Sequence, residues 1–179
     1  SVKKGQPSPL QQLSSMEQPM ETIDADRAAM IINQTDPNYQ FIDVRSSEEF
    51  LASSLPGAIN IPFDELMAPQ WQGYLKPEQK TNVLYSNGDY LSNMAVAFLS
   101  CKGYPGNITL KGGFNEWYEV VMNSEFKGGN LTARENALYG NRANARKLFT
   151  EINSLPDSLK NNFLEAKLLA EIELDGGCE

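Results

Sequence analysis

The chain has 179 residues and no histidine, and its 15 Lys and Arg against 23 Asp and Glu give a formal net charge of −8. Because domains usually hold on the order of 100 to 200 residues, this length suits one domain with a good core plus an appendage. Scattered acids without a basic run argue against a nucleic-acid partner, and the lack of histidine excludes Ser-His and Cys-His catalysis.

Residues 1–20 are expected to form a flexible polar segment. The stretch from Gln6 to Pro19 is rich in Gln, Pro and Ser, which is typical of a tether. It starts at Ser1 without a methionine, so we expect a mature or trimmed chain, compatible with a removed export signal or lipid anchor. This leaves the compartment open but favours the periplasm or cell envelope over the cytoplasm. No run approaches the roughly 20 apolar residues of a membrane span.

Residues 21–123 alternate short strands with helices. A first strand is expected at 21–23, and Asp24 is a good N-cap for the helix that follows. The apolar face of that helix consists of Ala28, Ala29, Ile31 and Ile32. A buried strand is expected at 40–44, and Ser46 with Glu49 forms a capping-box pattern that starts the next helix directly. This succession is typical of a βα unit.

The second half of this region continues the alternation. Further short strands are expected at 58–61, 81–85 and 108–110. Between them we expect a helical turn at 63–67, an irregular stretch at 69–77 and helices at 92–102 and 115–122. The apolar stripe of the 92–102 helix is expected to hold Met94, Ala95, Ala97, Phe98 and Cys101, with Cys101 as a small buried residue. The pattern predicts an α/β fold with a mainly parallel sheet and helices on both faces.

Residues 124–179 are expected to form a helical C-terminal extension. After a linker at 127–130, Thr132 or Asn130 can cap a helix over 133–153, although Gly140 costs about 1 kcal/mol there and favours a break. Pro156 suits the first turn of a second helix that reaches residue 174. The apolar stripes of the two helices are Leu148, Ile152 and Leu155, then Leu159, Phe163, Ala166 and Ala170. The pair either folds back on the sheet, the commoner outcome, or contacts another copy or a partner.

Several sequence blocks occur in the order of a known family. They are Phe-Ile-Asp-Val-Arg at 41–45, Leu-Pro-Gly-Ala-Ile-Asn-Ile-Pro at 55–62, the loop at Ser86, Gly-Tyr at 103–104, and Leu-Lys-Gly-Gly-Phe-Asn-Glu-Trp at 110–117. Together these blocks resemble the rhodanese-like sulfurtransferase domain. The resemblance implies a mainly parallel five-stranded sheet flanked by helices over 21–123, with the C-terminal extension outside the family pattern.

Ser86 is the position that decides the expected chemistry. It closes the strand at 81–85, where the resemblance implies a nucleophilic cysteine that carries sulfur as a persulfide. Because loop and helix N–H groups favour an anion, the resemblance implies an anion-binding loop made of Ser86, Asn87, Gly88, Asp89, Tyr90 and Leu91. A cysteine there ionises readily, whereas serine has neither a low pKa nor a polarisable sulfur, and no histidine is available as a base. We therefore expect Ser86 to occupy the catalytic position without activity.

The expected function is that of a catalytically inactive rhodanese-like module that binds an anion or a partner and acts in regulation. The loop lacks the cation that family loops frequently carry, and its Asp89 would repel an anion. An active enzyme whose cysteine was engineered to Ser86 is an alternative that would explain the serine but not the missing cation. Any activity would then be thiosulfate or persulfide sulfurtransfer.

The other candidate residues at the site are expected to have structural roles. By the resemblance, Asp43 and Arg45 make internal charge contacts, and Gly112 and Gly113 border the site without taking part in chemistry. Ser-Ser at 53–54 replaces the Gly-His that the family commonly has there.

A second hypothesis is a sulfur carrier or sulfurtransferase that acts through Cys178, a thiol near the C-terminus. Neighbouring Asp175 and Glu179 should raise the pKa of that thiol, which opposes ready reactivity. No metal site and no cofactor is expected, since two cysteines without histidine do not make the usual zinc ligand sets. The oligomeric state, the anion and the protein partner stay open.

Overall fold

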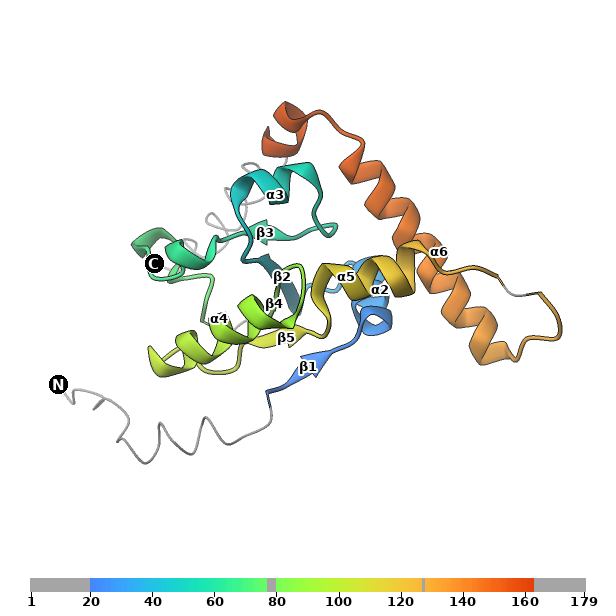
Figure 1. Cartoon of the computed structure of the whole chain (residues 1–179), viewed down its shortest axis with the longest axis horizontal. Helices are drawn as coiled ribbons and strands as arrows, with labels where there is room; N and C mark the ends of the chain where they lie inside the picture. The colour runs from blue at the N-terminus through green and yellow to red at the C-terminus, as the bar shows by residue number, and fades with distance from the viewer. Residues whose placement is uncertain (1–19, 77–79, 127, 163–179) are drawn as a thin grey trace, which may run out of the picture.

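The central layer of the fold is a five-stranded parallel sheet (Figure 1). The computed structural model describes residues 20–76, 80–126 and 128–162. The strands are β1 (Thr22–Ile23), β2 (Tyr39–Asp43), β3 (Ile59–Asn60), β4 (Thr81–Tyr85) and β5 (Ile108–Leu110), in the spatial order β1-β5-β4-β2-β3. Every pair of neighbouring strands runs parallel. The predicted mainly parallel five-stranded α/β sheet is confirmed.

The helices begin where side chains satisfy their first N–H groups or where a glycine allows the turn. They are α2 (Ala25–Gln34), α3 (Ser47–Ala52), α4 (Asp89–Cys101), α5 (Gly113–Trp117) and α6 (Ala133–Asn153). Short turns are η1 (Phe63–Glu65), η2 (Pro69–Trp71) and the π-helical η3 (Tyr118–Met122). Asp24, Ser46 and Thr132 cap α2, α3 and α6 through their side chains. The first two caps are as predicted, and for α6 the structure selects Thr132 over Asn130.

The two faces of the sheet bury separate apolar clusters. Along β4 the side chains of Val83 and Tyr85 enter one cluster and that of Leu84 enters the other, because successive strand residues point to opposite faces. Helices α2, α5 and α6 contribute to the first cluster, and α4 contributes to the second. The helices therefore cover both faces, as predicted.

Helix α4 differs from its predicted form in its start and its orientation. It begins at Asp89 rather than at residue 92, because Gly88 serves as the N-cap without any side-chain capping bond. Its buried residues are Ser92, Ala95, Val96 and Leu99. Met94 is 42% exposed and Cys101 is an exposed free cysteine. The prediction of a buried Cys101 is therefore wrong, since the buried face is turned away from it.

Helix α6 runs unbroken through Gly140, so the predicted break there is wrong. Contacts of the next two residues hold the helix against α2: Asn33 donates to the Asn141 carbonyl at 2.8 Å, and Arg142 pairs with Asp26 at 2.6 Å. These contacts offset the propensity loss of one glycine. The helix folds back on the sheet domain, the commoner of the two predicted outcomes.

The buried face of α6 also differs from the predicted stripe. Ala145 and Phe149 are buried, Leu148 and Ile152 are partly buried, and Leu155 is 40% exposed because it lies beyond the helix end. Residues 157–162 are helical again, and Leu159 among them is 51% exposed.

Some predictions fall on residues that the structure leaves out. Phe163, Ala166, Ala170, the predicted helix beyond residue 162, Cys178 and residues 1–19 lie outside the described residues. In the described part of the chain, no helix combines the length and the apolar character that crossing a membrane requires.

Candidate functional site

Ser86 lies at the carboxyl end of the central strand β4, where α/β sheets commonly place their sites. Its side chain is buried, with 3% of the residue exposed. The loop that follows is short, since α4 starts at Asp89 and only residues 86–88 separate it from the strand. Asp89, Tyr90 and Leu91 therefore belong to the first turn of α4 rather than to the loop.

The hydroxyl of Ser86 is turned into its own loop. Its Oγ donates a hydrogen bond of 2.6 Å to the carbonyl oxygen of Gly88. The same carbonyl accepts a longer bond of 3.3 Å from Ser92 Oγ. The hydrogen-bond partner of Ser86 Oγ is thus an acceptor, which suits a hydroxyl donor. A thiolate in this place could not donate and would face a carbonyl oxygen.

The residues after β5 hold the loop from the other side. The backbone N–H groups of Phe114 and Asn115 donate to the carbonyls of Ser86 and Asn87 at 2.8 and 2.9 Å. Gly113 makes this approach feasible, because a Cβ on it would lie 2.4 Å from the Ser86 oxygen. Its φ of +55° also favours glycine. The contact fixes the shape of the loop through backbone atoms alone.

Gly112 contacts the first residue of α4. Its N–H donates to the Asp89 carboxylate at 2.6 Å, so this carboxylate is turned toward the glycine turn. Glu116 lies beside the same glycine, because a Cβ on Gly112 would lie 2.4 Å from the Cβ of Glu116. Both glycines predicted to border the site therefore lie against the loop or the start of α4.

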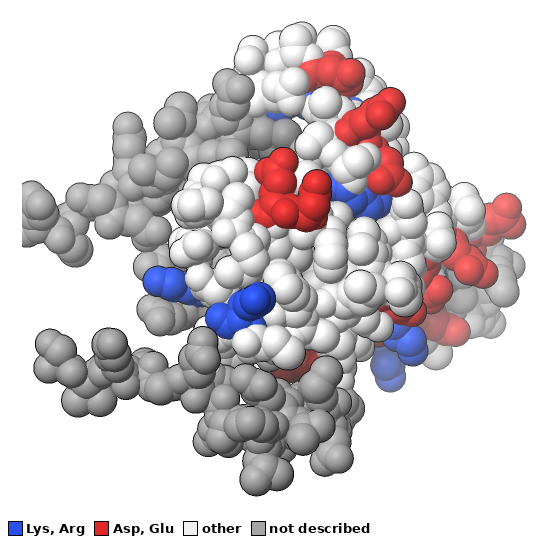
Figure 2. Space-filling model, turned by 60° about the vertical axis from the view of Figure 1, so that its left-hand side comes forward, with Lys and Arg blue, Asp and Glu red and all other residues white. Residues whose placement is uncertain are grey.

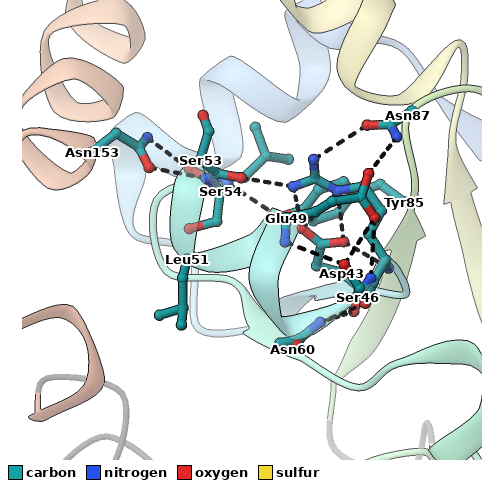
Figure 3. A network of polar contacts seen from close by, with 12 residues as sticks. Asp43, Ser46, Glu49, Leu51, Ser53, Ser54, Asn60, Tyr85, Asn87 and Asn153 are labelled. Atoms are coloured by element: carbon teal, nitrogen blue, oxygen red, sulfur yellow. Dashed lines mark hydrogen bonds and ion pairs between the residues drawn. The ribbon is translucent and has the colours of Figure 1, made fainter. Parts of the chain in front are cut away.

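Arg45 is hydrogen-bonded to residues of several segments, and Figure 3 shows three of these partners, Asp43, Ser53 and Asn87. Its Nη2 is 2.7 Å from the carboxylate of Asp43 and 2.7 Å from the carbonyl of Ser53. Its Nη1 donates to Asn87 Oδ1 at 3.2 Å, and Asn87 Nδ2 donates to Glu49 at 2.8 Å. We call these five residues the Arg45 network: Asp43, Arg45, Glu49, Ser53 and Asn87.

Burial and neighbouring charges have opposite effects on the pKa values of Asp43 and Arg45 in the Arg45 network. Burial raises the pKa of the Asp43 carboxyl, and the hydrogen bond and charge of Arg45 only partly oppose this. Burial alone would lower the pKa of Arg45, but its bonds to Asp43 outweigh that and raise it. The amide of Asn87 lowers the pKa of Glu49. Burial raises the pKa of the neighbouring Tyr85 phenol well above its usual value, and the nearby Asp43 charge adds to this.

Arg45 is therefore not free to bind a ligand. It is 6% exposed, and its guanidinium lies 4.3 Å from the ring centre of Phe114. None of residues 86–91 is Lys or Arg. Arg45, which contacts the loop through Asn87, is thus engaged in internal contacts, and the structural role expected for Asp43 and Arg45 stays a prediction.

Sequence reasoning missed the contacts that join the segment around Ser53 to the C-terminal extension, and Figure 3 shows Asn153 beside Ser54. The side chain of Asn153 accepts from the N–H of Ser54 and donates to its carbonyl, both at 2.9 Å. Lys160, which is 6% exposed, donates to the carbonyl of Leu51 at 2.8 Å. No local pattern reveals such distant pairs. The only sequence signal was the Ser-Ser at 53–54, where the family has other residues.

The surroundings of the loop are acidic. Glu49 is bonded to the loop through Asn87, and Asp89 and Glu116 lie at Gly112. On the face that Figure 2 shows, acidic side chains form several groups, and basic side chains lie beside some of them. Within the described ranges, no three of His, Cys, Asp and Glu come together in a way that could hold a metal ion. The predicted anion-binding role of residues 86–91 and the reactivity of Cys178 stay predictions.

A separate cavity of about 390 Å³ lies at the other end of the strands. It opens between the end of α2, the start of β2 and the last turns of α6. Its lining includes Ile31, Tyr39, Phe41, Pro56, Leu148 and Ile152. None of the predicted site residues lines it, so the loop at Ser86 and this cavity are distinct features.

Comparisons with known proteins identify one matching family and two curated relatives. The family model described as Rhodanese-like domain matches residues 26–120, more than half of the chain. The chain is 33% identical over 96 residues to the adenylyltransferase and sulfurtransferase UBA4 of Meyerozyma guilliermondii, covering 50% of this chain and 22% of that protein. It is 28% identical over 107 residues to the probable molybdopterin-synthase adenylyltransferase of Porphyra purpurea. That match covers 60% of this chain and 28% of that protein. The chain thus spans less than a third of either curated relative.

A solved structure agrees in fold. The rhodanese-like domain from Anabaena has 22% sequence identity and a TM-score of 0.50, with 63% of this chain and 89% of that domain covered. This likeness concerns the fold alone. Helix α6 lies outside the residues that the family model matches.

Proposed function

The chain belongs to the rhodanese-like domain family, and on that premise we propose that it is a module that does not transfer sulfur through Ser86 and acts by binding a protein partner at the loop. The observation that carries this proposal is the bond of 2.6 Å from Ser86 Oγ to the Gly88 carbonyl. The side chain at the nucleophile position is buried and already paired within its loop. We assign the module a regulatory role without turnover.

The chemistry of the neighbouring groups supports the absence of catalysis. A serine nucleophile needs a base within hydrogen-bond reach, and the chain has no histidine. The carboxylate of Glu49 is bonded to Asn87 and Ser46, and that of Asp89 accepts the N–H of Gly112. In the described part of the chain, neither carboxylate is hydrogen-bonded to the Ser86 hydroxyl. We therefore expect no group to deprotonate the Ser86 hydroxyl and make it a nucleophile at neutral pH.

A protein partner fits this place better than a small free anion. The carboxylates of Glu49, Asp89 and Glu116 oppose an anion near the loop, and Arg45 is occupied by Asp43. Tyr90, in the first turn after the loop, is 78% exposed and offers an aromatic contact. Aromatic side chains are enriched where proteins recognise one another.

Sulfur mapping tests the absence of transfer. The protein is incubated with a low-molecular-weight persulfide, and its peptides are analysed by mass spectrometry beside a Ser86→Cys variant in a Cys101→Ser, Cys178→Ser background. We expect no added sulfur on the peptide with residue 86 in either protein, because the loop carries a carboxylate and no cation. Ready sulfur uptake by Ser86→Cys would instead support an active loop in which serine replaced cysteine.

The same experiment addresses the second proposal, sulfur carriage by Cys178. Added sulfur on Cys178 but not on the exposed Cys101 would favour that route. Two curated relatives have names that mention sulfurtransferase or adenylyltransferase, so a sulfur-handling role is the natural competitor. Equal labelling of both thiols would mean unselective chemistry.

Calorimetric titration with sulfate and thiosulfate tests the choice between anion and partner. We expect no binding tighter than about 1 mM, an affinity equivalent to about −4 kcal/mol. Tighter binding that Asp89→Asn strengthens would show that the loop receives anions. The partner proposal would then give way to the anion-binding one.

A further inference from the structure

Asn87 is the only asparagine of the chain that is followed by a glycine. The backbone nitrogen of the next residue can attack an asparagine side chain and close a five-membered succinimide ring. The attack is least hindered at glycine, because glycine has no Cβ to crowd the nitrogen. Asn87 is also exposed, so water reaches its amide. Asn87 and Gly88 therefore have the residue types and the solvent access that self-modification requires.

The attacking atom is the backbone nitrogen of Gly88. Within the described ranges its N–H has no hydrogen-bond acceptor, whereas the N–H groups of Phe114 and Asn115 on the other side of the loop are both bonded. A bonded N–H must first give up its acceptor before its nitrogen can attack. The Gly88 nitrogen is therefore available without breaking a contact of the fold.

Charged groups hold both polar atoms of the Asn87 side chain, and Figure 3 shows its contact with Glu49. Oδ1 accepts from Arg45 Nη1 at 3.2 Å, and Nδ2 donates to the Glu49 carboxylate at 2.8 Å. The guanidinium withdraws electrons from Cγ and stabilises the negative charge that develops on Oδ1 during attack. The carboxylate stabilises the nitrogen as it takes up a proton and leaves. Glu49 keeps its charge at neutral pH, because the Asn87 amide lowers its pKa.

We propose that Asn87 is a site of spontaneous deamidation in the folded protein, promoted by Arg45 and Glu49. The Gly88 nitrogen loses its proton to solvent and bonds to Cγ of Asn87. The bond from Cγ to Nδ2 breaks, and the amine takes up a proton from water and leaves as ammonia. Water then opens the succinimide at either carbonyl, which gives aspartate or isoaspartate. No atom is oxidised or reduced, so water is the only co-reactant.

The product changes the charge and the shape of the loop irreversibly. A carboxylate at position 87 keeps the attraction of Arg45, but it lacks the N–H that Glu49 accepts, so two carboxylates repel each other there. Isoaspartate also adds a methylene to the backbone and displaces the carbonyl that accepts from Asn115. This inference goes beyond the proposed function and does not depend on it.

Peptide mapping by mass spectrometry during incubation of the full chain tests the proposal. We expect the peptide with Asn87 to become about 1 Da heavier as an amide is replaced by a carboxylate. The change should be faster in the folded chain than in the same chain unfolded in guanidinium chloride, because unfolding separates Asn87 from Arg45 and Glu49. Asn123, which is exposed and precedes Ser124, is the internal reference and should change much more slowly. Conversion of Asn87 that is no faster in the folded chain would overturn the proposal.

Two variants separate the nucleophile from the charged groups. Gly88→Ala should slow the conversion by about tenfold or more in both folded and unfolded chains, which corresponds to a barrier about 1.4 kcal/mol higher. The fold accommodates this change, since Gly88 has an extended φ of −141° and a Cβ would meet only Asn115 Nδ2, at 4.0 Å. An unchanged rate in Gly88→Ala would exclude attack by this nitrogen.

The charge of Glu49 is tested in the same assay. Glu49→Gln should slow the conversion by about fivefold in the folded chain and leave the unfolded chain unchanged, because the contact with Asn87 exists only in the fold. Glu48→Gln removes the charge of an exposed neighbour and is the matched control, with no change expected. Equal slowing by both variants would contradict the role of Glu49. Circular dichroism of each variant verifies that it folds.

Discussion

The Arg45 network and the Ser86 hydroxyl lie next to each other at the same end of the sheet, yet they are held very differently. Arg45 contacts Asp43, the Ser53 carbonyl and Asn87, which belong to separate segments of the chain. Within the described residues, Ser86 Oγ is hydrogen-bonded only to a carbonyl of its own loop. The first region joins segments together, whereas the second contributes one local bond.

This difference separates the contacts that depend on side chains from those that depend on the backbone alone. The contacts that shape the loop run through the backbone of residues 86–88 and 112–115, and they do not depend on the side chain at 86. The buried pair of Asp43 and Arg45 does depend on its side chains. A change of the side chain at 86 is therefore compatible with the fold, whereas removing one member of the ion pair should cost stability.

Replacing Arg45 should have the largest effect. Arg45→Met leaves the fully buried carboxylate of Asp43 without its partner, and we expect a loss of about 3–5 kcal/mol in the free energy of unfolding. Arg142→Met is the control, because it also removes an arginine from an aspartate, but at a pair exposed by 18% and 29%. That control should lose about 1 kcal/mol or less in urea unfolding. Equal losses of stability in the two variants would mean that burial does not make the Asp43–Arg45 pair more important than the Asp26–Arg142 pair.

Closing the space at Gly113 should have the next largest effect. Gly113→Ala places a Cβ 2.4 Å from the Ser86 oxygen at a φ of +55°, and we expect a loss of about 3 kcal/mol together with a displaced loop. Gly57→Ala isolates the backbone strain, because Gly57 has a φ of +75° with nothing within 4 Å of a Cβ. It should lose only about 1 kcal/mol. Thermal or denaturant unfolding of both variants measures the difference.

Removing the Ser86 hydroxyl should matter much less. Ser86→Ala loses the bond to the Gly88 carbonyl, which still accepts from Ser92, so the expected loss is about 1 kcal/mol. Urea unfolding beside Arg45→Met gives the direct contrast between the two regions. A loss as large as that of Arg45→Met would show that the loop depends on this side chain after all.

The smallest expected effect is a shift in the titration of Glu49. Its pKa is lowered chiefly by the Asn87 amide, so its contribution to stability is present above the usual value of 4.5 and lost as pH falls through the lowered pKa. Asn87→Ala should raise that pKa toward 4.5 in an NMR titration. The pKa of Glu135, lowered by the backbone of Thr132, serves as an unaffected reference. An unchanged Glu49 pKa in Asn87→Ala would mean that the Asn87 amide is not what lowers it.

Local patterns were sufficient for much of the fold. The strands Thr81–Tyr85 and Ile108–Leu110 and the helix Ala133–Asn153 have the bounds that the sequence predicts. Short apolar runs between turn residues define such strands, and Thr132 was one of the two caps, with Asn130, that the sequence offered for the helix start. The family blocks placed Ser86 at the end of the central strand in the same way.

Local patterns could not show which face of a helix is buried or which residues far apart in the sequence contact each other. In α4 both faces carry apolar residues, so periodicity alone could not tell that Ala95 and Leu99 face the sheet while Met94 and Cys101 face outward. The bonds between Asn153 and Ser54 join residues 99 apart in the chain. Such contacts depend on where α6 packs, which no short window of sequence encodes.

The central claim is that the loop at Ser86 keeps its shape but not its reaction, and turnover of thiosulfate and cyanide to thiocyanate tests it most directly. The full chain should produce thiocyanate no faster than its Ser86→Ala variant, because no thiolate exists at the end of β4. Turnover by the full chain that Ser86→Ala abolishes, with the exposed Cys101 replaced in both proteins, would contradict the account.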